Sequence, residues 1–224
     1  MKKLKSLVAS SALLVSTISS MNANDIDTAF NITGASNYLV RGITQTNDKA
    51  ALFLEGTLLY NGFFTGAWTS NIEFEGLDGN REIDLYAGYS KEIFGFETTL
   101  TYTKFLYPDS KDIANLDETE IKVVYPIDKF SLGGKYIFGV YVENDGEKLD
   151  YYEGFASYDF DILKLNGSAG SFEDIGDNFE ISVSKVFDLQ KGSLKLELLY
   201  NEFYSDNSSS EDQDNLYAKI TYSF

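Results

Sequence analysis

The sequence LYAKITYSF (216–224) alternates between apolar and polar side chains along its length. Successive side chains of a β-strand point to opposite sides, so a two-residue period places all members of one class on one face. The apolar face would carry Leu216, Ala218, Ile220, Tyr222 and Phe224. This stretch therefore predicts a strand that is apolar on one side and polar on the other.

The same two-residue period recurs upstream in segments of about ten residues. We expect twelve strands, at residues 28–39, 50–60, 63–74, 81–91, 96–107, 118–125, 130–142, 149–159, 161–172, 178–187, 193–204 and 214–224. An even number of alternating segments of this length is typical of a transmembrane β-barrel.

The connections between these segments alternate between tight and long. The tight ones are at 61–62, 92–95, 126–129, 160–161 and 188–192, and the long ones are at 41–49, 75–80, 108–117, 143–148, 173–177 and 205–213. Outer-membrane barrels have short periplasmic turns and longer external loops. The sequence thus predicts an all-β fold, an antiparallel transmembrane β-barrel of about twelve strands with long acidic loops outside.

The first residues have the features of a secretory signal peptide. Lys2, Lys3 and Lys5 precede an apolar stretch at 7–18, and small or polar residues follow as far as Ala23. We therefore expect a signal peptide at 1–23 and the barrel at 24–224. Removal of the three lysines lowers the formal net charge from −17 to −20, which makes nucleic acid an unsuitable partner.

A soluble periplasmic or secreted barrel would show the same alternation with its apolar face inward. Lipid outside is favoured by the aromatic residues near the strand ends, where outer-membrane barrels have aromatic girdles. The expected girdle residues are Tyr38, Tyr60, Phe74, Tyr89, Tyr107, Tyr125, Tyr200 and Tyr222. The predicted location is the bacterial outer membrane.

Three stretches carry a resemblance to a known family: SNYLVRGITQT (36–46), GFFTGAWTSN (62–71) and EIDLYAGY (82–89). They resemble the TorF-type porins, a proteobacterial family of outer-membrane barrels. The resemblance implies a Gram-negative outer membrane with its lipid and lipopolysaccharide as surroundings, and diffusion of small solutes. A terminal strand ending in Phe224 is similar to those that the barrel-assembly machinery recognises.

The chain contains neither histidine nor cysteine. Outer-membrane enzymes of similar architecture use a histidine as general base, and thiolate and imidazole are the ligands of soft metals. We therefore expect no enzyme, no cofactor and no metal centre.

Charged residues on the predicted inner faces form the candidate pore lining. They are Arg41, Glu55, Glu73, Asp84, Glu97, Glu120, Lys122, Lys135, Glu153, Lys164, Glu180, Lys195, Glu197 and Lys219. One interpretation is a lining that favours cations or zwitterions through its local field. The other is a narrow lumen filled by pairs across the strands.

Arg41 has two interpretations, a constriction or loop latch and a structural salt bridge, and in both it folds inward to a carboxylate. The acidic stretches 109–120 and 206–214 would either bridge Ca²⁺ or Mg²⁺ to lipopolysaccharide phosphates or remain solvated and repel one another. The predicted function is a porin-like channel for small solutes or ions. The alternative is a non-conducting structural or adhesive barrel with a filled lumen.

Overall fold

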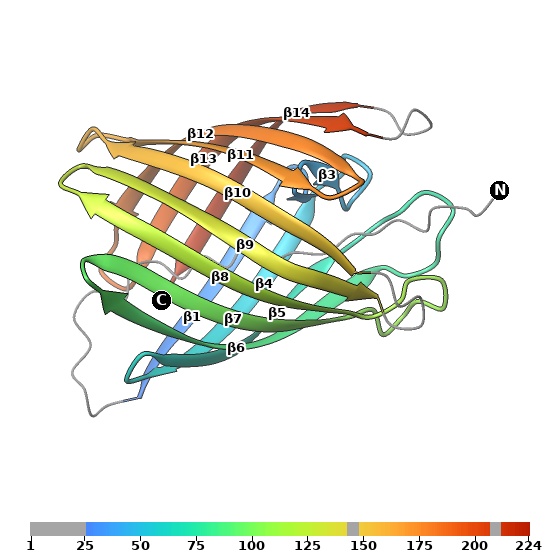
Figure 1. Cartoon of the computed structure of the whole chain (residues 1–224), viewed down its shortest axis with the longest axis horizontal. Coiled ribbons are helices and arrows are strands. Elements are labelled where there is room, and N and C mark those ends of the chain that lie inside the picture. The colour runs from blue at the N-terminus through green and yellow to red at the C-terminus, as the bar shows by residue number, and fades with distance from the viewer. Residues whose placement is uncertain (1–25, 143–147, 207–211) are drawn as a thin grey trace.

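The computed structural model describes residues 26–142, 148–206 and 212–224, and they form one closed antiparallel barrel (Figure 1). The wall consists of β1 (Asp27–Ala35), β4 (Ala51–Tyr60), β5 (Phe63–Asn71), β6 (Arg81–Ile93), β7 (Phe96–Leu106), β8 (Leu116–Ile127), β9 (Phe130–Val142), β10 (Lys148–Asp159), β11 (Lys164–Phe172), β12 (Gly176–Asp188), β13 (Ser193–Ser205) and β14 (Gln213–Ser223). Each strand pairs with its neighbour in sequence, and β1 pairs with both β4 and β14. The predicted twelve-stranded antiparallel barrel is confirmed. The expected signal peptide at 1–23 lies outside the described residues.

The apolar faces of the strands point out of the barrel. On β14, Leu216 and Ile220 are 70% and 48% exposed, whereas Tyr217 and Thr221 between them are each 3% exposed. The same alternation places Leu196 and Leu198 outside and Leu199 inside on β13. An apolar exterior contradicts the soluble barrel, in which these leucines would meet in a dry centre. No helix among the described residues is long and apolar enough to cross a membrane.

Five tight turns lie at one end of the barrel, called here the turn end, and the longer connections lie at the other, the loop end. The turn at Asn61–Gly62 has φ of 49° and 84°, the backbone of a two-residue hairpin whose twist matches that of the strands. One expected long loop is wrong: Gly176 already begins β12, so only residues 173–175 connect β11 to β12. Residues 143–147 of the expected loop at 143–148 and residues 207–211 of that at 205–213 lie outside the described residues, and Lys148 already begins β10.

The chain between β1 and β4 does not form an external loop. It enters the barrel as a small hairpin of β2 (Leu39–Val40) and β3 (Ile43–Thr44). We call residues 36–50 the inner hairpin. The expected first strand, 28–39, was therefore too long: β1 ends at Ala35, and from Asn37 the side chains are buried inside the barrel.

Candidate functional site

The tip of the inner hairpin is Arg41–Gly42, where both residues have positive φ, 49° and 88°. A Cβ on Gly42 would lie 2.9 Å from Cβ of Phe203 and 3.0 Å from Cβ of Asn178, on the inner faces of β13 and β12. Glycine is required at this position both by its backbone conformation and by the close approach. The tip is therefore packed tightly against the barrel wall.

Arg41 reaches across the lumen to β8. Its Nη2 lies 2.7 Å from Oε1 of Glu118, and the two side chains are only 3% and 5% exposed. The guanidinium carbon lies 4.8 Å from the ring centres of both Tyr151 on β10 and Phe172 on β11. The expectation of an inward-folded, paired arginine is confirmed, and Glu118 is its partner. Such a buried pair is held by close charge contact and by the aromatic faces.

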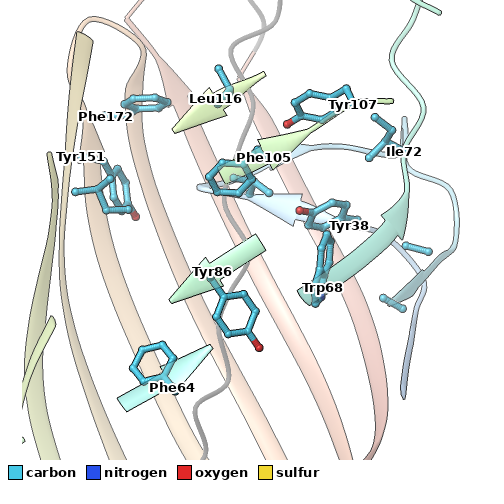
Figure 2. Close-up of a cluster of buried hydrophobic side chains, with 14 residues drawn as sticks. Tyr38, Phe64, Trp68, Ile72, Tyr86, Phe105, Tyr107, Leu116, Tyr151 and Phe172 are labelled. Atoms are coloured by element: carbon cyan, nitrogen blue, oxygen red, sulfur yellow. The ribbon is translucent and has the colours of Figure 1, made fainter. Parts of the chain in front are cut away.

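The base of the inner hairpin is held by aromatic packing on the other side of the barrel (Figure 2). The ring of Tyr38 lies 5.1 Å from that of Phe53 and 5.4 Å from that of Trp68, both on the inner wall. The Tyr38 hydroxyl donates to Oε1 of Glu82 at 3.2 Å. Asn37 Nδ2 donates to Oδ1 of Asn215 at 3.2 Å, which joins the hairpin to β14.

Side chains fill the lumen around the inner hairpin. Gln45 and Thr46 of the hairpin and Glu82 and Tyr151 of the wall have no exposed surface. Because the hairpin contacts strands on every side of the barrel, it obstructs the loop-end half of the lumen.

Twelve of the fourteen candidate pore-lining residues lie on inward faces of the wall strands. They are Glu55, Asp84, Glu97, Glu120, Lys122, Lys135, Glu153, Lys164, Glu180, Lys195, Glu197 and Lys219. Most of them are half-buried or exposed, in contrast to the residues around the inner hairpin. Arg41 lies on the inner hairpin rather than on the wall.

Glu73 lies outside the barrel wall, because β5 ends at Asn71 and not at 74. The backbone N–H groups of Ile72 and Glu73 donate to the carbonyls of Asn80 and Gln45, away from the sheet. The Glu73 carboxylate is half-exposed and pairs with Lys49. The expected position of Glu73 on an inner strand face is wrong.

The sequence did not reveal Glu118, Tyr151 or Phe172 as contacts of Arg41. In the structure they lie on the inward faces of their strands, but the course of the inner hairpin has no two-residue period that could be extended from β1. For the same reason Tyr38 was wrongly expected in a girdle, although it is buried in the lumen. Two other expected girdle residues are also wrong, since Tyr107 is buried and Phe74 packs against the core.

Contacts between strands and along one strand order the charged side chains nearer the turn end. Lys135 Nζ lies 3.4 Å from Oε1 of Glu153, and Lys195 Nζ lies 2.6 Å from Oε1 of Glu197. Tyrosine hydroxyls bind further carboxylates: Tyr86 donates to Glu55 at 2.9 Å and Tyr217 donates to Glu180 at 2.7 Å. The interior is thus partly paired and partly uncompensated.

Two loops at the loop end are joined through Asp78. Its Oδ1 accepts hydrogen bonds from the Ser110 hydroxyl at 3.0 Å and from the Lys111 N–H at 2.9 Å. These bonds, chiefly that from the Lys111 backbone, lower the pKa of Asp78 below its ordinary value. No group of three or more Asp or Glu placed to hold a metal ion occurs among the residues that the structure describes.

A family model described as "Bacterial protein of unknown function (Gcw_chp)" matches residues 21–166. No curated protein sequence matches the chain. Among solved structures, a KdgM porin has a TM-score of 0.61 at 12% identity, covering 88% of this chain and 99% of that one. A NanC porin has a TM-score of 0.57 at 9% identity, covering 87% of this chain and 98% of its own. The COG4313 outer membrane channel from Pseudomonas putida F1 has a TM-score of 0.51 at 10% identity, with coverage of 91% and 96%. At these identities the likeness shows a shared fold.

Proposed function

The chain belongs to the Gcw_chp family of bacterial proteins, and we propose that it is a porin-like channel of the bacterial outer membrane for passive diffusion of small solutes or ions. The apolar exterior supports a location in lipid. The closed barrel supports it too, because only a closed barrel or a helix satisfies the backbone hydrogen-bonding groups within a bilayer. The likeness to the KdgM and NanC porins supports the channel. So does the resemblance of 36–46, 62–71 and 82–89 to the TorF-type porins.

The observation that carries the proposal is the division of the lumen along its length. Toward the turn end, Lys195 and Lys135 line an interior in which they remain 24% and 22% exposed. Toward the loop end, the inner hairpin obstructs the lumen and is held across it by the Arg41–Glu118 pair. A charged, wetted passage that is narrowed by one segment, the inner hairpin, is the arrangement expected of a constricted channel.

Single-channel conductance in planar bilayers tests this proposal. The wild-type chain is compared with a variant in which residues 36–50 are replaced by Asn-Gly. Ala35 and Ala51 are Cα partners on β1 and β4, so a two-residue turn closes this hairpin without disturbing the wall. We expect small current steps from the wild type and larger steps from the variant. Silence from both folded proteins would overturn the channel.

A second candidate function is a non-conducting structural or adhesive barrel with a filled lumen. The complete burial of Gln45, Thr46 and Tyr151 at the level of the inner hairpin favours it. A silent wild type beside a conducting hairpin-shortened variant would support this candidate.

We also propose that the protein is not an enzyme, since histidine and cysteine are absent from the sequence. The proposed surroundings are outer-membrane lipid and lipopolysaccharide. The proposed assembly partner is the barrel-assembly machinery, which would bind the strand ending in Phe224.

A further inference from the structure

The turn end of the lumen carries an excess of carboxylates. We call the turn-end rim the first inward-facing residue of each of the twelve wall strands, counted from the turn end. Five of these residues are acidic and one is a lysine, and all six side chains are exposed: Asp27, Glu92, Glu97, Asp159, Lys164 and Asp188. The other six are uncharged: Leu59, Phe64, Pro126, Ser131, Ser193 and Ser223. The rim therefore presents net negative charge to the passage.

Little of this negative charge is neutralised within the rim. Lys164 is the direct cross-strand partner of Asp159, so it can offset that carboxylate. Glu92 and Glu97 are also direct partners, and two like charges therefore lie side by side. Four rim carboxylates form no ion pair with any residue that the structure describes: Asp27, Glu92, Glu97 and Asp188.

The five tight turns next to the rim do not compensate it either. Their acidic residues, Asp128 and Asp161, are equal in number to their basic ones, Lys129 and Lys191. Lys129 forms an ion pair with Asp161. The turns thus add no net charge beside the passage.

The inward charges deeper in the lumen do not reverse the sign. Two of the four deeper lysines are paired with carboxylates, Lys135 with Glu153 and Lys195 with Glu197. The other two are Lys122 and Lys219, and three half-buried carboxylates outside those pairs outnumber them: Glu55, Glu120 and Glu180. At the level of the inner hairpin the inward acidic residues are buried: Glu82, Asp84 and Glu118. A solute that enters from the turn end therefore meets excess negative charge at the rim and again beyond it.

The rim carboxylates are distributed around the barrel rather than gathered on one side. In the closed strand order, β6 and β7 are separated from β12 and from β1 on both sides by other strands. Low-dielectric walls of one sign concentrate the field in the passage that they enclose and raise the local concentration of counter-ions. Rings of Asp and Glu side chains are one means by which cation channels select their ions. A ring of this kind attracts a cation and repels an anion of the same size.

We propose that the channel selects small cations over anions, and that the turn-end rim is the main source of this selectivity. This inference rests on the proposed channel function. Four carboxylates without an opposite charge set the sign: Asp27, Glu92, Glu97 and Asp188. Asp159 contributes less, because Lys164 lies opposite to it.

The reversal potential of single channels in a gradient of KCl tests this selectivity. K⁺ and Cl⁻ have nearly equal mobilities in water, so any potential that develops reports the preference of the protein. The dilute side is kept near 0.1 M, where charges act over about 10 Å. We expect K⁺ to be at least about threefold more permeant than Cl⁻. Equal permeabilities, or a preference for Cl⁻, would overturn the selectivity while leaving the channel intact.

A rim variant locates the source of the preference. The substitutions Asp27→Asn, Glu92→Gln, Glu97→Gln and Asp188→Asn keep the size of each side chain and leave Asp159 balanced by Lys164. We expect them to bring the permeability ratio close to one. A rim variant that keeps the wild-type ratio would overturn the assignment to the rim.

The matched control removes two glutamates and two aspartates that are exposed at the loop end: Glu75→Gln, Glu173→Gln, Asp174→Asn and Asp206→Asn. This control should keep the wild-type ratio, and an equal fall in both variants would contradict a specific role for the rim. The same gradient is applied to the hairpin-shortened variant and to that variant with the rim substitutions, so that a narrow wild-type passage does not hide the preference. If neither the wild type nor the hairpin-shortened variant conducts, the channel itself is refuted, and its cation selectivity with it.

Discussion

Arg41 and Glu118 form an ion pair inside the barrel, with Nη2 and Oε1 2.7 Å apart, although 77 positions separate them in the sequence. One residue belongs to the tip of the inner hairpin and the other to the wall. The pair is the point at which the obstructing segment is fixed to the far side of the lumen. Its removal therefore has consequences both for stability and for the passage.

We expect Arg41→Ala to lower the free energy of unfolding by about 3–5 kcal/mol, because it leaves Glu118 buried without a partner. Movement of the inner hairpin would let water reach Glu118, which would recover part of this stability. The same movement would widen the passage and raise the conductance. Unfolding in urea from lipid vesicles and planar-bilayer recordings measure the two effects. The double variant Arg41→Met, Glu118→Leu should recover most of the stability.

Arg81→Ala is the matched control for that experiment. Arg81 pairs with Asp109 at 3.0 Å, but the two side chains are 51% and 42% exposed. An exposed pair contributes at most about 1 kcal/mol, so this variant should change neither stability nor conductance appreciably. If Arg41→Ala lowered the free energy of unfolding no more than Arg81→Ala does, the claim that the Arg41–Glu118 pair fixes the inner hairpin would be contradicted.

Gly42→Ala should disturb the inner hairpin more than a glycine substitution in an open loop. Alanine in the left-handed region costs about 1–2 kcal/mol wherever it occurs, and at Gly42 the new Cβ would also meet Phe203 at 2.9 Å. Gly76→Ala is the control, since Gly76 has φ of 74° with nothing within 4 Å of its Cβ position. Urea unfolding should show a larger loss for Gly42→Ala. Equal losses would mean that the tip is not packed against the wall.

The contact between the two loops at Asp78 should be lost in acid. Hydrogen bonds from the Lys111 N–H and its neighbours lower the pKa of Asp78, so the joined loops favour the carboxylate. The stabilisation is therefore present above the ordinary aspartate pKa of about 3.9 and disappears as the pH falls through the lower value. The amide proton shift of Lys111, followed by NMR from neutral pH into acid, reports this change. In Asp78→Asn the same amide should show no such titration, and an identical titration there would contradict the assignment.

The barrel wall could be predicted from the sequence because its physical cause is local. Each strand separates lipid-facing from lumen-facing side chains, so the two-residue period gives the strand and its orientation together. On β13, Leu196 and Leu198 outside and Glu197 between them follow directly from this alternation. The inward placement of twelve candidate residues has the same origin.

The inner hairpin could not be predicted in this way, because its position depends on contacts distant in the sequence. Residues 41–49 are mostly polar and short of periodic signals, as an external loop would be. The two features that distinguish them, a lone arginine and the adjacent Gly42, indicated an inward-folded pair but not its partner. Only the closed barrel brings Glu118, Tyr151 and Phe172 to the guanidinium.

The claim on which the others depend is that the apolar faces contact lipid and the charged faces enclose a wetted lumen. Because the sequence contains no cysteine, a spin label can be attached at a single introduced cysteine. We place it in turn at each of residues 194–198 on β13, with the protein in lipid vesicles. Collision rates with oxygen, which concentrates in lipid, and with a water-soluble nickel chelate measure the surroundings of each label. We predict that oxygen dominates at Leu194, Leu196 and Leu198 and the nickel chelate at Lys195 and Glu197. The reverse pattern, or no alternation along the strand, would contradict the account.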